Sequence, residues 1–349
     1  MKKLIFIAVI AGFLMTSCQQ NSPKKETEKA VTQDQKELLA RAQMFFQPLP
    51  TEAPNPENLL SEAKVKLGKQ LYFDTRLSKN GTQSCNTCHD LSNYGVDNLP
   101  TSPGDNGTLG TRNSPTVFNS ALRTAQFWDG RNKDVEEQAG GPVLNPIEMG
   151  MHSEAEVESR LVEVPGYVSL FAEAFPEDQN PINYVNMRKA IGAFERTLIT
   201  PSRFDSYLNG DAHALTNQEQ NGLKLFIDQG CIACHMGPLL GGNMMQKMGL
   251  FGDYHEVIKA KLDDHGKFEE TKVETDKGMF FVPGLRNVEK TAPYFHNGGI
   301  ADIKESIKIM GRLQLGKEFT DEQINDMAQF FVALTGNIPD EVKQAPPAF

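Results

Sequence analysis

Apolar residues recur every three or four positions in several stretches of this chain, which is the spacing of one buried face of an α-helix. The clearest stretches are residues 34–46, 184–198 and 321–336. Similar patterns occupy the first parts of residues 63–89 and 218–235. Strict alternation of apolar and polar residues, which indicates strands, is scarce. The pattern predicts a mainly α protein with loops rich in Gly, Pro and Asn between its helices.

The helical pattern repeats loosely, and each copy leads into the same five-residue motif. An apolar helix with a glycine on one face, Gly68 or Gly222, precedes a Cys-x-x-Cys-His sequence in both halves of the chain. An amphipathic helix later closes each half. This order of elements is the plan of a cytochrome c domain. We therefore expect two cytochrome c-like domains, residues 34–205 and 206–349, joined near residues 200–215.

Polar residues and a glycine mark the expected ends of the helices in the second half. Thr216 and Glu219 have the spacing of a capping box, and so do Thr320 and Gln323. Gly336 follows the last helical pattern, and glycine is the residue that most often stops a helix. We therefore expect the last helix to begin after Thr320 and to end at Gly336.

The first residues have the pattern of an export signal. MKKLIFIAVIAGFLMTSC contains two early lysines, a short apolar run and small residues before a cysteine. LMTSC resembles a bacterial lipoprotein cleavage box, which predicts a signal peptide over residues 1–17, lipidation of Cys18 and a flexible tether over residues 18–33. The alternative is an ordinary signal peptide that happens to contain a cysteine. We expect a periplasmic protein that its lipid holds at a membrane.

Charge and cysteine content narrow the chemistry. The chain has 45 Asp and Glu against 35 Lys and Arg, which argues against a nucleic-acid partner and favours a basic protein partner. Besides Cys18, the cysteines are Cys85, Cys88, Cys231 and Cys234, and all four belong to Cys-x-x-Cys-His motifs. None is left to form a disulfide framework, although an exported protein could carry one.

The two Cys-x-x-Cys-His motifs predict two covalently bound haem c groups. Two thiols on one turn can add to the two vinyl groups of a haem, and the adjacent histidine then lies under the iron as its proximal ligand. A Cys-x-x-Cys pair could instead be a redox dithiol or half of a zinc site. Two copies that both end in histidine favour haem c. The predicted proximal ligands are His89 and His235.

The second half offers several methionines as a sixth iron ligand. The candidates are Met236, Met244, Met245, Met248, Met279, Met310 and Met327. Met236 directly follows the proximal histidine and cannot reach the opposite face of a haem. Met327 lies within the final helical pattern, where core packing explains it. Met310 precedes that helix and is our prediction for the ligand.

The first half offers no obvious sixth ligand. The chain has no histidine between residues 90 and 151. His152 stands beside Ser153, which is placed to cap a helix, so a solvent-facing histidine at a helix start is the simpler explanation. An iron with an open face can bind external ligands, which indicates chemistry and not only electron storage.

Longer motifs give a resemblance to a known family. With the two haem motifs in order, FWDGR at 127–131, EQAGGPVLNPIEM at 137–149 and LRNVEKTAPYFHNGG at 285–299 closely resemble bacterial di-haem cytochrome c peroxidases. The resemblance covers about residues 57–336, and MauG-type di-haem enzymes are the nearest relatives of that family. It implies a peroxidatic N-terminal haem, a C-terminal haem where electrons enter, and hydrogen peroxide as the substrate.

The resemblance also implies roles for particular residues. Met310 matches the axial methionine of the second haem, where MauG-type enzymes have a tyrosine. Trp128, the only tryptophan of the chain, matches the tryptophan that lies between the two haems. Glu148 and Gln138 match the polar pair over the peroxidatic iron. Glu148 is then expected to move the proton that peroxide cleavage requires, with Gln138 orienting the peroxide.

A calcium ion between the domains is a further implication of the resemblance. Its expected protein ligands are the side chain of Asn113 and the backbone carbonyls of Thr291 and Pro293. Hard oxygen ligands of this kind suit calcium. Without the resemblance, these residues would predict turns and nothing more.

One position departs from the family pattern. Many members carry a histidine in a TS-x-GH stretch after the first haem motif, and it covers the peroxidatic iron until the other haem is reduced. This chain has TSPGDN, with Asp105 at that position. We therefore expect peroxide to bind the first haem without reductive activation.

The sequence as a whole predicts a di-haem cytochrome c peroxidase that takes electrons from a small cytochrome c or a cupredoxin, and that forms a homodimer in the manner of its family. Two alternatives stay open. One is a MauG-type oxidase that acts on a protein substrate. The other is an electron-transfer cytochrome without peroxide chemistry, in which both haems have six ligands.

Overall fold

The computed structural model describes residue 1, residues 30–259 and residues 264–349. The predicted signal peptide, Cys18 and most of the tether lie outside the described residues. The described part is mainly helical, as predicted. The helices are α1 (Gln33–Phe45), α2 (Glu62–Tyr72), α3 (Cys85–Cys88), α4 (Val135–Gln138), α5 (Gly141–Leu144), α6 (Glu154–Val162), α7 (Pro165–Ala174), α8 (Tyr184–Glu195), α9 (Arg203–Leu208), α10 (Asn217–Asp228), α11 (Tyr254–Val257), α12 (Phe268–Thr271), α13 (Ile303–Leu315), α14 (Asp321–Ala333) and α15 (Asp340–Lys343). The strands β1 (Met245–Lys247) and β2 (Met279–Phe281) pair antiparallel.

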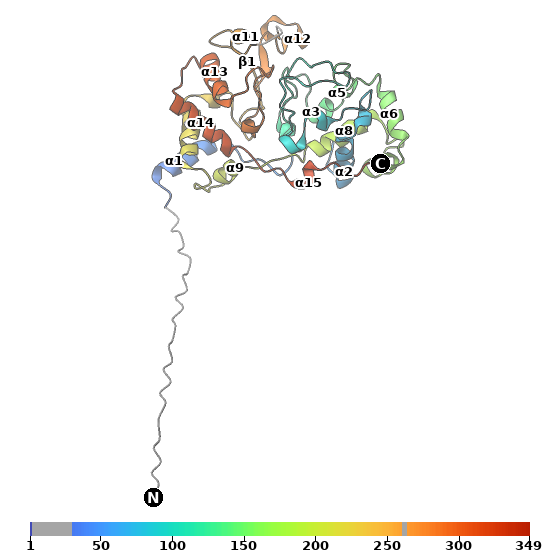
Figure 1. The fold of residues 1–349 in the computed structure, drawn as a ribbon, viewed down its shortest axis with the longest axis horizontal. Coiled ribbons are helices and arrows are strands. Elements are labelled where there is room, and N and C mark those ends of the chain that lie inside the picture. Colours follow the sequence, from blue (N-terminus) through green and yellow to red (C-terminus); the bar gives the residue numbers. More distant parts are fainter. Residues whose placement is uncertain (2–29, 260–263) are drawn as a thin grey trace.

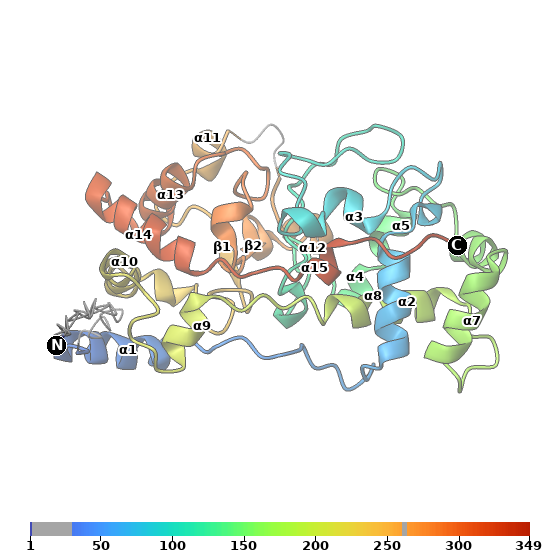
Figure 2. The same cartoon turned by 60° about the horizontal axis from the view of Figure 1, so that its bottom comes forward.

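Two lobes lie side by side (Figure 1). The first lobe is built around α2 and α8, and the second around α10 and α14. A second view of the molecule shows the same separation (Figure 2). Each lobe has its own hydrophobic core, which agrees with the repeat seen in the sequence.

The two central helices of each lobe cross at a glycine. A Cβ atom on Gly68 of α2 would lie 1.9 Å from the carbonyl oxygen of Ala190 in α8. A Cβ atom on Gly222 of α10 would lie 2.0 Å from the carbonyl oxygen of Asp326 in α14. Any larger residue at either site would push the backbones apart. The shared packing explains why both halves carry a glycine in the same place before the haem motif.

The capping boxes form as predicted, but the last helix is shorter than we expected. The side chains of Thr216 and Thr320 accept from the N–H groups of Glu219 and Gln323. α14 ends at Ala333, so the prediction that Gly336 stops the helix is wrong. Gly336 instead lies against the backbone of residue 200, where a Cβ atom would be 2.3 Å from a carbonyl oxygen. Gly336 therefore allows the chain after α14 to pass close to the backbone at Thr200.

The N-terminal helix packs on the second lobe, and the C-terminal segment packs on the first lobe. α1 belongs to the core of the second lobe, as does α9, whose Phe204 and Tyr207 are buried there. Ile338 and Val342, near the C-terminus, pack against the core of the first lobe. The packing therefore does not follow a division at residues 205 and 206, because the chain crosses between the lobes at both ends.

A third apolar cluster joins the lobes. It contains Phe280, Phe295, Ile309 and Leu313 of the second lobe, and Trp128 of the first lobe packs against it. The β1–β2 pair borders this region, and the Phe281 N–H donates to the carbonyl oxygen of Trp128 (2.8 Å). The lobes are thus held together around the tryptophan.

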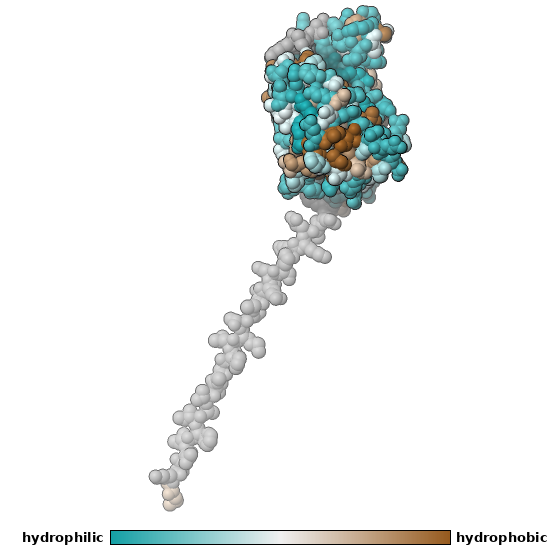
Figure 3. All heavy atoms as spheres, turned by 90° about the vertical axis from the view of Figure 1, so that its right-hand side faces the viewer, coloured by the Kyte–Doolittle hydropathy of each residue, from teal (hydrophilic) through white to brown (hydrophobic). Residues whose placement is uncertain are grey.

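The surface is mostly hydrophilic, with an apolar patch at the end of the first lobe (Figure 3). The exposed apolar side chains of α6, α7 and the C-terminus include Val162, Val168 and Phe349. Within residues 30–259 and 264–349, no helix has both the length and the apolar character needed to cross a membrane.

Candidate functional site

The first Cys-x-x-Cys-His motif forms the short helix α3 and the residue after it. The Ser84 N–H donates to the Thr87 hydroxyl (3.0 Å), which fixes the start of the turn. The His89 N–H donates to the Cys85 carbonyl (3.0 Å), and the Tyr72 hydroxyl donates to the His89 carbonyl (2.7 Å). The two cysteines and the histidine are thereby held on one turn.

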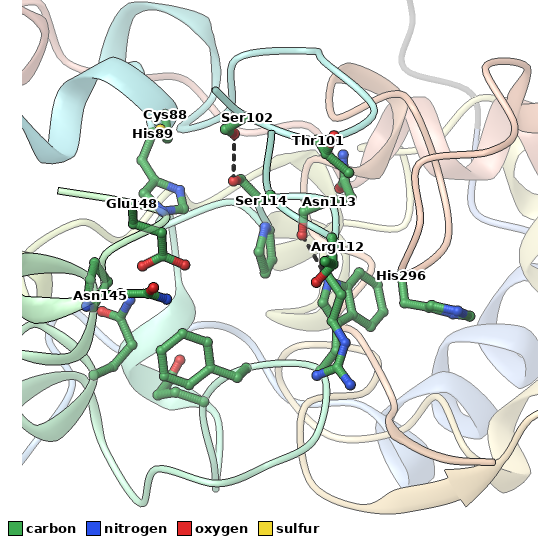
Figure 4. Close-up of a pocket in the computed structure, with 18 of the residues that line it drawn as sticks. Cys88, His89, Thr101, Ser102, Arg112, Asn113, Ser114, Asn145, Glu148 and His296 are labelled. Carbon is green, nitrogen blue, oxygen red and sulfur yellow. Dashed lines mark hydrogen bonds between the residues drawn. The ribbon is translucent and has the colours of Figure 1, made fainter. Parts of the chain in front are cut away.

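Cys85, Cys88 and His89 line a cavity of about 1200 Å³. Loops of the first lobe form most of its wall, and residues 296–299 of the second lobe close one side. Figure 4 shows polar side chains that reach this space from several segments. Gln138, Glu148, Trp128 and Asn113 also line the cavity, so the structure brings most of the first-lobe predictions together.

The chemistry of the two thiols favours attachment of a haem. Burial raises the pKa of both, and it raises the pKa of Cys88 to about 11. A redox dithiol needs a thiol whose pKa is lowered, so this pair is poorly suited to that role. Among the described residues, no group of three or more His, Cys, Asp and Glu side chains converges as a metal site would require.

A guanidinium group supports the fit of a haem in this cavity. Arg123 lines the cavity, and in the described part of the chain no carboxylate pairs with it. Its only hydrogen bond there is a long one to the Thr116 carbonyl (3.4 Å). Burial lowers the pKa of Arg123 to about 10. A buried cation is stable only with a partner, and the carboxylates of a haem would supply one.

Glu148 presents its carboxylate to the cavity (Figure 4). Burial raises the pKa of this group, and the nearby Arg131 opposes the shift only in part. Its side chain has no hydrogen bond to any other described residue, whereas its backbone is fixed by the Asn145 carbonyl (3.0 Å) and by the Asp105 N–H (2.7 Å). A carboxyl group held in place with a raised pKa is suited to accept and return a proton.

Gln138 reaches the same cavity from a different element. It is the last residue of α4, a helix that Asp134 caps by accepting from the Glu137 N–H (2.8 Å). α5 separates Gln138 from Glu148 in sequence, and the turn it makes returns the chain to the cavity. An amide at this place can both donate to and accept from a small polar ligand.

Trp128 stands between the cavity and the second lobe. Its indole N–H donates to the Asn113 carbonyl (2.9 Å), and its ring meets His296 edge-on with 6.4 Å between ring centres. It lines the cavity on one side and on the other packs against the apolar cluster that contains Ile309 and Leu313. This location agrees with a residue between two cofactor sites.

Ion pairs next to Trp128 tie the lobes together. The buried Asp129 accepts from both Arg112 (2.5 Å) and Arg131 (2.7 Å). Arg112 also binds Asp264 of the second lobe through two hydrogen bonds, of 2.5 Å and 2.7 Å. Such forked, partly buried pairs fix geometry well. They limit how far the tryptophan loop can move relative to the second lobe.

The second motif repeats the arrangement of the first. Cys231 and Cys234 lie on one turn that follows α10, and Gly230 precedes them with a φ of +95°. The Nδ1 atom of His235 lies 3.0 Å from the Leu240 carbonyl. A hydrogen bond there leaves Nε2 as the metal-binding atom, which is how backbone carbonyls orient ligating histidines.

Met310 lies within helix α13, and not in a loop as in the simplest cytochromes. It is partly buried and packs against the cluster that contains Ile309 and Leu313. Polarisable, flexible side chains are common in such places. The structure thus places Met310 in the second lobe, against the same apolar cluster that Trp128 contacts, and its role as an iron ligand stays a prediction.

The three residues predicted for calcium lie on segments that meet between the lobes. Asn113 donates through its side chain to the Leu99 carbonyl (2.9 Å). Asn98, from the same first-lobe loop, donates to the carbonyl of Ala292 (2.5 Å), which lies between Thr291 and Pro293 in the sequence. The loop that includes residues 98–100 therefore bridges the two segments.

Asp105 does not line the cavity. Its carboxylate accepts from the Asn80 N–H (2.7 Å) and from the Thr82 hydroxyl (2.5 Å), in the turn ahead of the first haem motif. Burial alone would raise the pKa of Asp105, but these hydrogen bonds outweigh it and lower the pKa. The carboxylate is thus committed to the turn, and ligation of an iron by Asp105 does not fit this arrangement.

Sequence reasoning missed several residues of the site. Arg123 and Asp264 line the cavity and belong to no motif that we used. Glu195 also lines it, and the helical pattern of residues 184–198 gave it no role. Asp264 is far from its partner Arg112 in the chain, so only the fold reveals the pair. His296 belongs to a motif that we quoted, but its burial was not foreseen. Burial lowers the pKa of His296 to about 4, and its ring stacks on Phe280.

The chain is similar to several known proteins. The family model for di-haem cytochrome c peroxidase matches residues 62–213. Cytochrome c551 peroxidase of Pseudomonas aeruginosa is 44% identical over 305 residues, which cover 86% of this chain and 87% of that protein. Its counterpart from Nitrosomonas europaea is 44% identical over 83% of this chain and 84% of that protein. A solved structure of a MauG-like protein associated with microbial copper homeostasis has a TM-score of 0.76 and 30% identity, over 85% of this chain and 97% of that one.

Proposed function

Because the chain belongs to the di-haem cytochrome c peroxidase family, we propose that it reduces hydrogen peroxide to water with electrons from a small redox protein. The observation that carries the proposal is the cavity of the first lobe. It combines a Cys-x-x-Cys-His turn with Glu148 and Gln138, and no histidine side chain of the 90–151 segment is present to cover an iron there.

The two Cys-x-x-Cys-His motifs are the proposed attachment sites of two haem c groups. Cys85 and Cys88 would hold the first haem over His89, and Cys231 and Cys234 the second over His235. When bound, the haems supply iron centres that bind peroxide and exchange electrons. The cavity volume, the raised thiol pKa values and the unpaired Arg123 support this assignment for the first lobe.

Glu148 is the proposed proton carrier. Cleavage of peroxide to water requires a proton to move from the inner oxygen to the outer oxygen, so that water can leave. A carboxyl group with a raised pKa can accept the first proton and return it without a large free-energy change. Gln138 would hold the peroxide in line, since its amide can donate to one oxygen and accept from the other.

Electrons would enter at the second lobe and pass by Trp128. Met310 is the proposed sixth ligand of the second iron, and a thioether there favours the reduced state. A methionine also argues against the MauG-type oxidase, which has a tyrosine at this place. The acidic chain favours a donor with a basic face, such as a small cytochrome c or a cupredoxin, and an association that weakens with salt.

The remaining assignments follow from the sequence and from the family. We infer a periplasmic location, with the lipid on Cys18 as the membrane anchor. We also infer a calcium ion that Asn113, Thr291 and Pro293 hold between the lobes. The meeting of these segments supports the ion, because hydrogen bonds of Asn98 and Asn113 hold the loop 98–100 between Asn113 and the segment of Ala292. Oxygen ligands from such segments suit calcium. Family members are often dimers, and a homodimer is the proposed assembly.

The test is peroxide turnover by the fully oxidised holoprotein, with a reduced small cytochrome c as donor. We expect turnover without a lag, together with a spectrum in which one haem lacks a strong sixth ligand. An electron-transfer cytochrome would show two six-coordinate haems and no turnover. A MauG-type oxidase would turn over the donor weakly and accumulate stabilised oxidised states. A bis-histidine spectrum for the first haem, or activity only after one haem is reduced, would overturn the open site.

A further inference from the structure

Three segments of the first lobe meet around Asp105, and we call this meeting point the Asp105 junction. The segments are the turn 79–83, the loop 103–106 and the turn 146–149, which contains Glu148. The turn 79–83 leads directly into Cys85, so the junction links the first haem motif to the proposed proton carrier.

The carboxylate of Asp105 holds the turn. Its Oδ2 atom accepts from the Asn80 N–H (2.7 Å), and its Oδ1 atom accepts from the Thr82 hydroxyl (2.5 Å) and the Thr82 N–H (3.3 Å). The Asn80 side chain donates back to the Asp105 carbonyl (3.2 Å). Hydrogen bonds to a charged group are stronger than those between neutral groups, and these converge on one carboxylate.

The backbone around Asp105 holds the segment of Glu148. The Asp105 N–H donates to the Glu148 carbonyl (2.7 Å), and the Lys79 N–H donates to the Met149 carbonyl (2.8 Å). At Gly104, a Cβ atom would lie 1.6 Å from the Ile147 carbonyl oxygen, so the two backbones are in direct contact. The backbone at Glu148 and Met149 is therefore hydrogen-bonded to both segments that Asp105 joins, the loop 103–106 and the turn 79–83.

We propose that Asp105 is a positioning residue, whose carboxylate ties the loop to the turn before Cys85 while its N–H keeps Glu148 in register with the first haem motif. The proposal rests on the function proposed above, and it deepens it. The proton carrier is then in place before any electron arrives, and the loop has no need to rearrange. A displacement of about 1 Å in such a group can lower a rate about a hundredfold, so a fixed junction has catalytic value.

The test compares Asp105→Ala, Asp105→Asn and a control in the haem-loaded protein. Asp178→Ala is the control, because Asp178 also organises a loop by accepting several hydrogen bonds, in a region that does not touch Glu148. Hydrogen exchange of the segments 100–110 and 143–150 reports on the junction itself. The kcat and the KM for peroxide report on its effect.

For Asp105→Ala we expect exchange in both segments to accelerate by about ten- to a hundredfold. We expect kcat to fall by about ten- to a hundredfold, with haem content and the KM for the donor unchanged. Asp105→Asn should have an intermediate effect, since its oxygen can still accept from Thr82 while its NH₂ group faces the Asn80 N–H. Asp178→Ala should leave both segments and kcat as in the wild type.

Unchanged exchange and unchanged kcat in Asp105→Ala would overturn the proposal, and so would a loss of kcat that only follows a loss of haem-loaded protein. If that variant does not fold, Thr82→Val removes one hydrogen bond of the same carboxylate and should shift both measurements in the same direction. The exchange measurement does not depend on peroxide turnover. An inactive wild type would therefore refute the proposed function while the junction could still be judged by itself.

Discussion

The two lobes share a scaffold and differ in what the scaffold carries. In both, a capped helix with a glycine at the crossing leads to Cys-x-x-Cys-His, and a second helix packs across it. The spacing at the crossing is also the same. Phe194 lies four residues after Ala190 in α8, and Phe330 lies four residues after Asp326 in α14. Each phenylalanine touches the crossing glycine of its lobe. The crossed helix pair and the Cys-x-x-Cys-His turn are thus common to both lobes, and we call them the frame.

The segments between the haem motif and the closing helix make the difference. In the first lobe they supply Glu148, Gln138 and Arg123, which are polar and surround a cavity. In the second lobe they supply Met310 and an apolar cluster of aromatic and aliphatic side chains. A polar cavity suits a reaction on a small ligand, whereas apolar surroundings and a thioether suit electron transfer. The two lobes thus share their helical frame and differ in the loops that surround each Cys-x-x-Cys-His motif.

The largest effect that tests this difference is expected for Glu148→Gln. Glutamine keeps the size of the side chain but cannot carry the proton, so kcat for peroxide should fall by about a hundred- to ten-thousandfold. Reduction of the second haem by the donor should be unaffected. Stopped-flow measurement of both steps checks the prediction.

The control for this variant is Glu163→Gln, at an exposed glutamate that follows α6 in the same lobe. It should have wild-type turnover. The pH profile adds a second check. Burial raises the pKa of Glu148, so the proton-accepting form of the wild type should be lost at a higher pH than an ordinary carboxylate would show as the solution is acidified. Full turnover in Glu148→Gln would remove the chemical distinction between the lobes.

The shared frame is tested by Gly68→Ala and Gly222→Ala. The new methyl groups would meet backbone oxygens at 1.9 Å and 2.0 Å, so each variant should lose about 1–3 kcal/mol of stability. Equal losses are expected in thermal or denaturant unfolding, because the two crossings are alike. Gly141→Ala is the matched control, since its Cβ atom would have its nearest neighbour at 3.7 Å. A large loss in only one lobe would show that the frames are not equivalent.

Much of the frame could be predicted from the sequence, because it depends on local signals. Capping boxes at Thr216 and Thr320 and the small residues Gly68 and Gly222 are visible in the chain, and the structure confirms their places. Gly336 was misread, because a glycine after a helix can serve either a helix end or a close approach, and the sequence does not distinguish the two.

The site was less accessible to prediction. The resemblance identified Glu148 and Gln138, and the structure places both at the cavity. It gave no role to Asp105, since the family has a histidine there and the partners of Asp105 only become visible in the fold. The pairing of Arg112 with Asp264 joins the two lobes and leaves no local pattern. Contacts between distant segments are the part that local sequence signals do not encode.

A smaller effect is expected where the lobes meet. Trp128→Phe keeps an aromatic ring in the apolar cluster but removes the hydrogen bond to the Asn113 carbonyl. Electron transfer from the second lobe to the first should slow by about tenfold, which is about 1.4 kcal/mol in the barrier. Rapid mixing of the half-reduced protein with peroxide measures this step. Peroxide binding to the oxidised protein should be unchanged, and equal slowing of both would point to a collapsed cavity instead.

A pH-dependent effect on stability is expected for a buried acid at a position where the second lobe has a phenylalanine. By the register of the two helix pairs, Glu195 in α8 corresponds to Phe331 in α14. Glu195 is 5% exposed, and burial, together with the charge of Glu136, raises its pKa to about 8. Below the ordinary glutamate pKa, both the folded and the unfolded chain hold the proton. Between that value and about 8, only the folded chain holds it.

The stability that Glu195 contributes is therefore fully present in acid and is lost as the pH rises through about 8. Glu195→Gln cannot titrate, so its stability should gain on that of the wild type between pH 5 and pH 8, by about 1.4 kcal/mol for each pH unit, or roughly 4 kcal/mol in all. Tm measured across this pH range checks the prediction. Parallel Tm curves for the two proteins would show that this carboxyl group is not strained. Ionisation of Glu195 would then cost the first lobe no stability, and the chemical contrast between the lobes would rest on Glu148 and its neighbours alone.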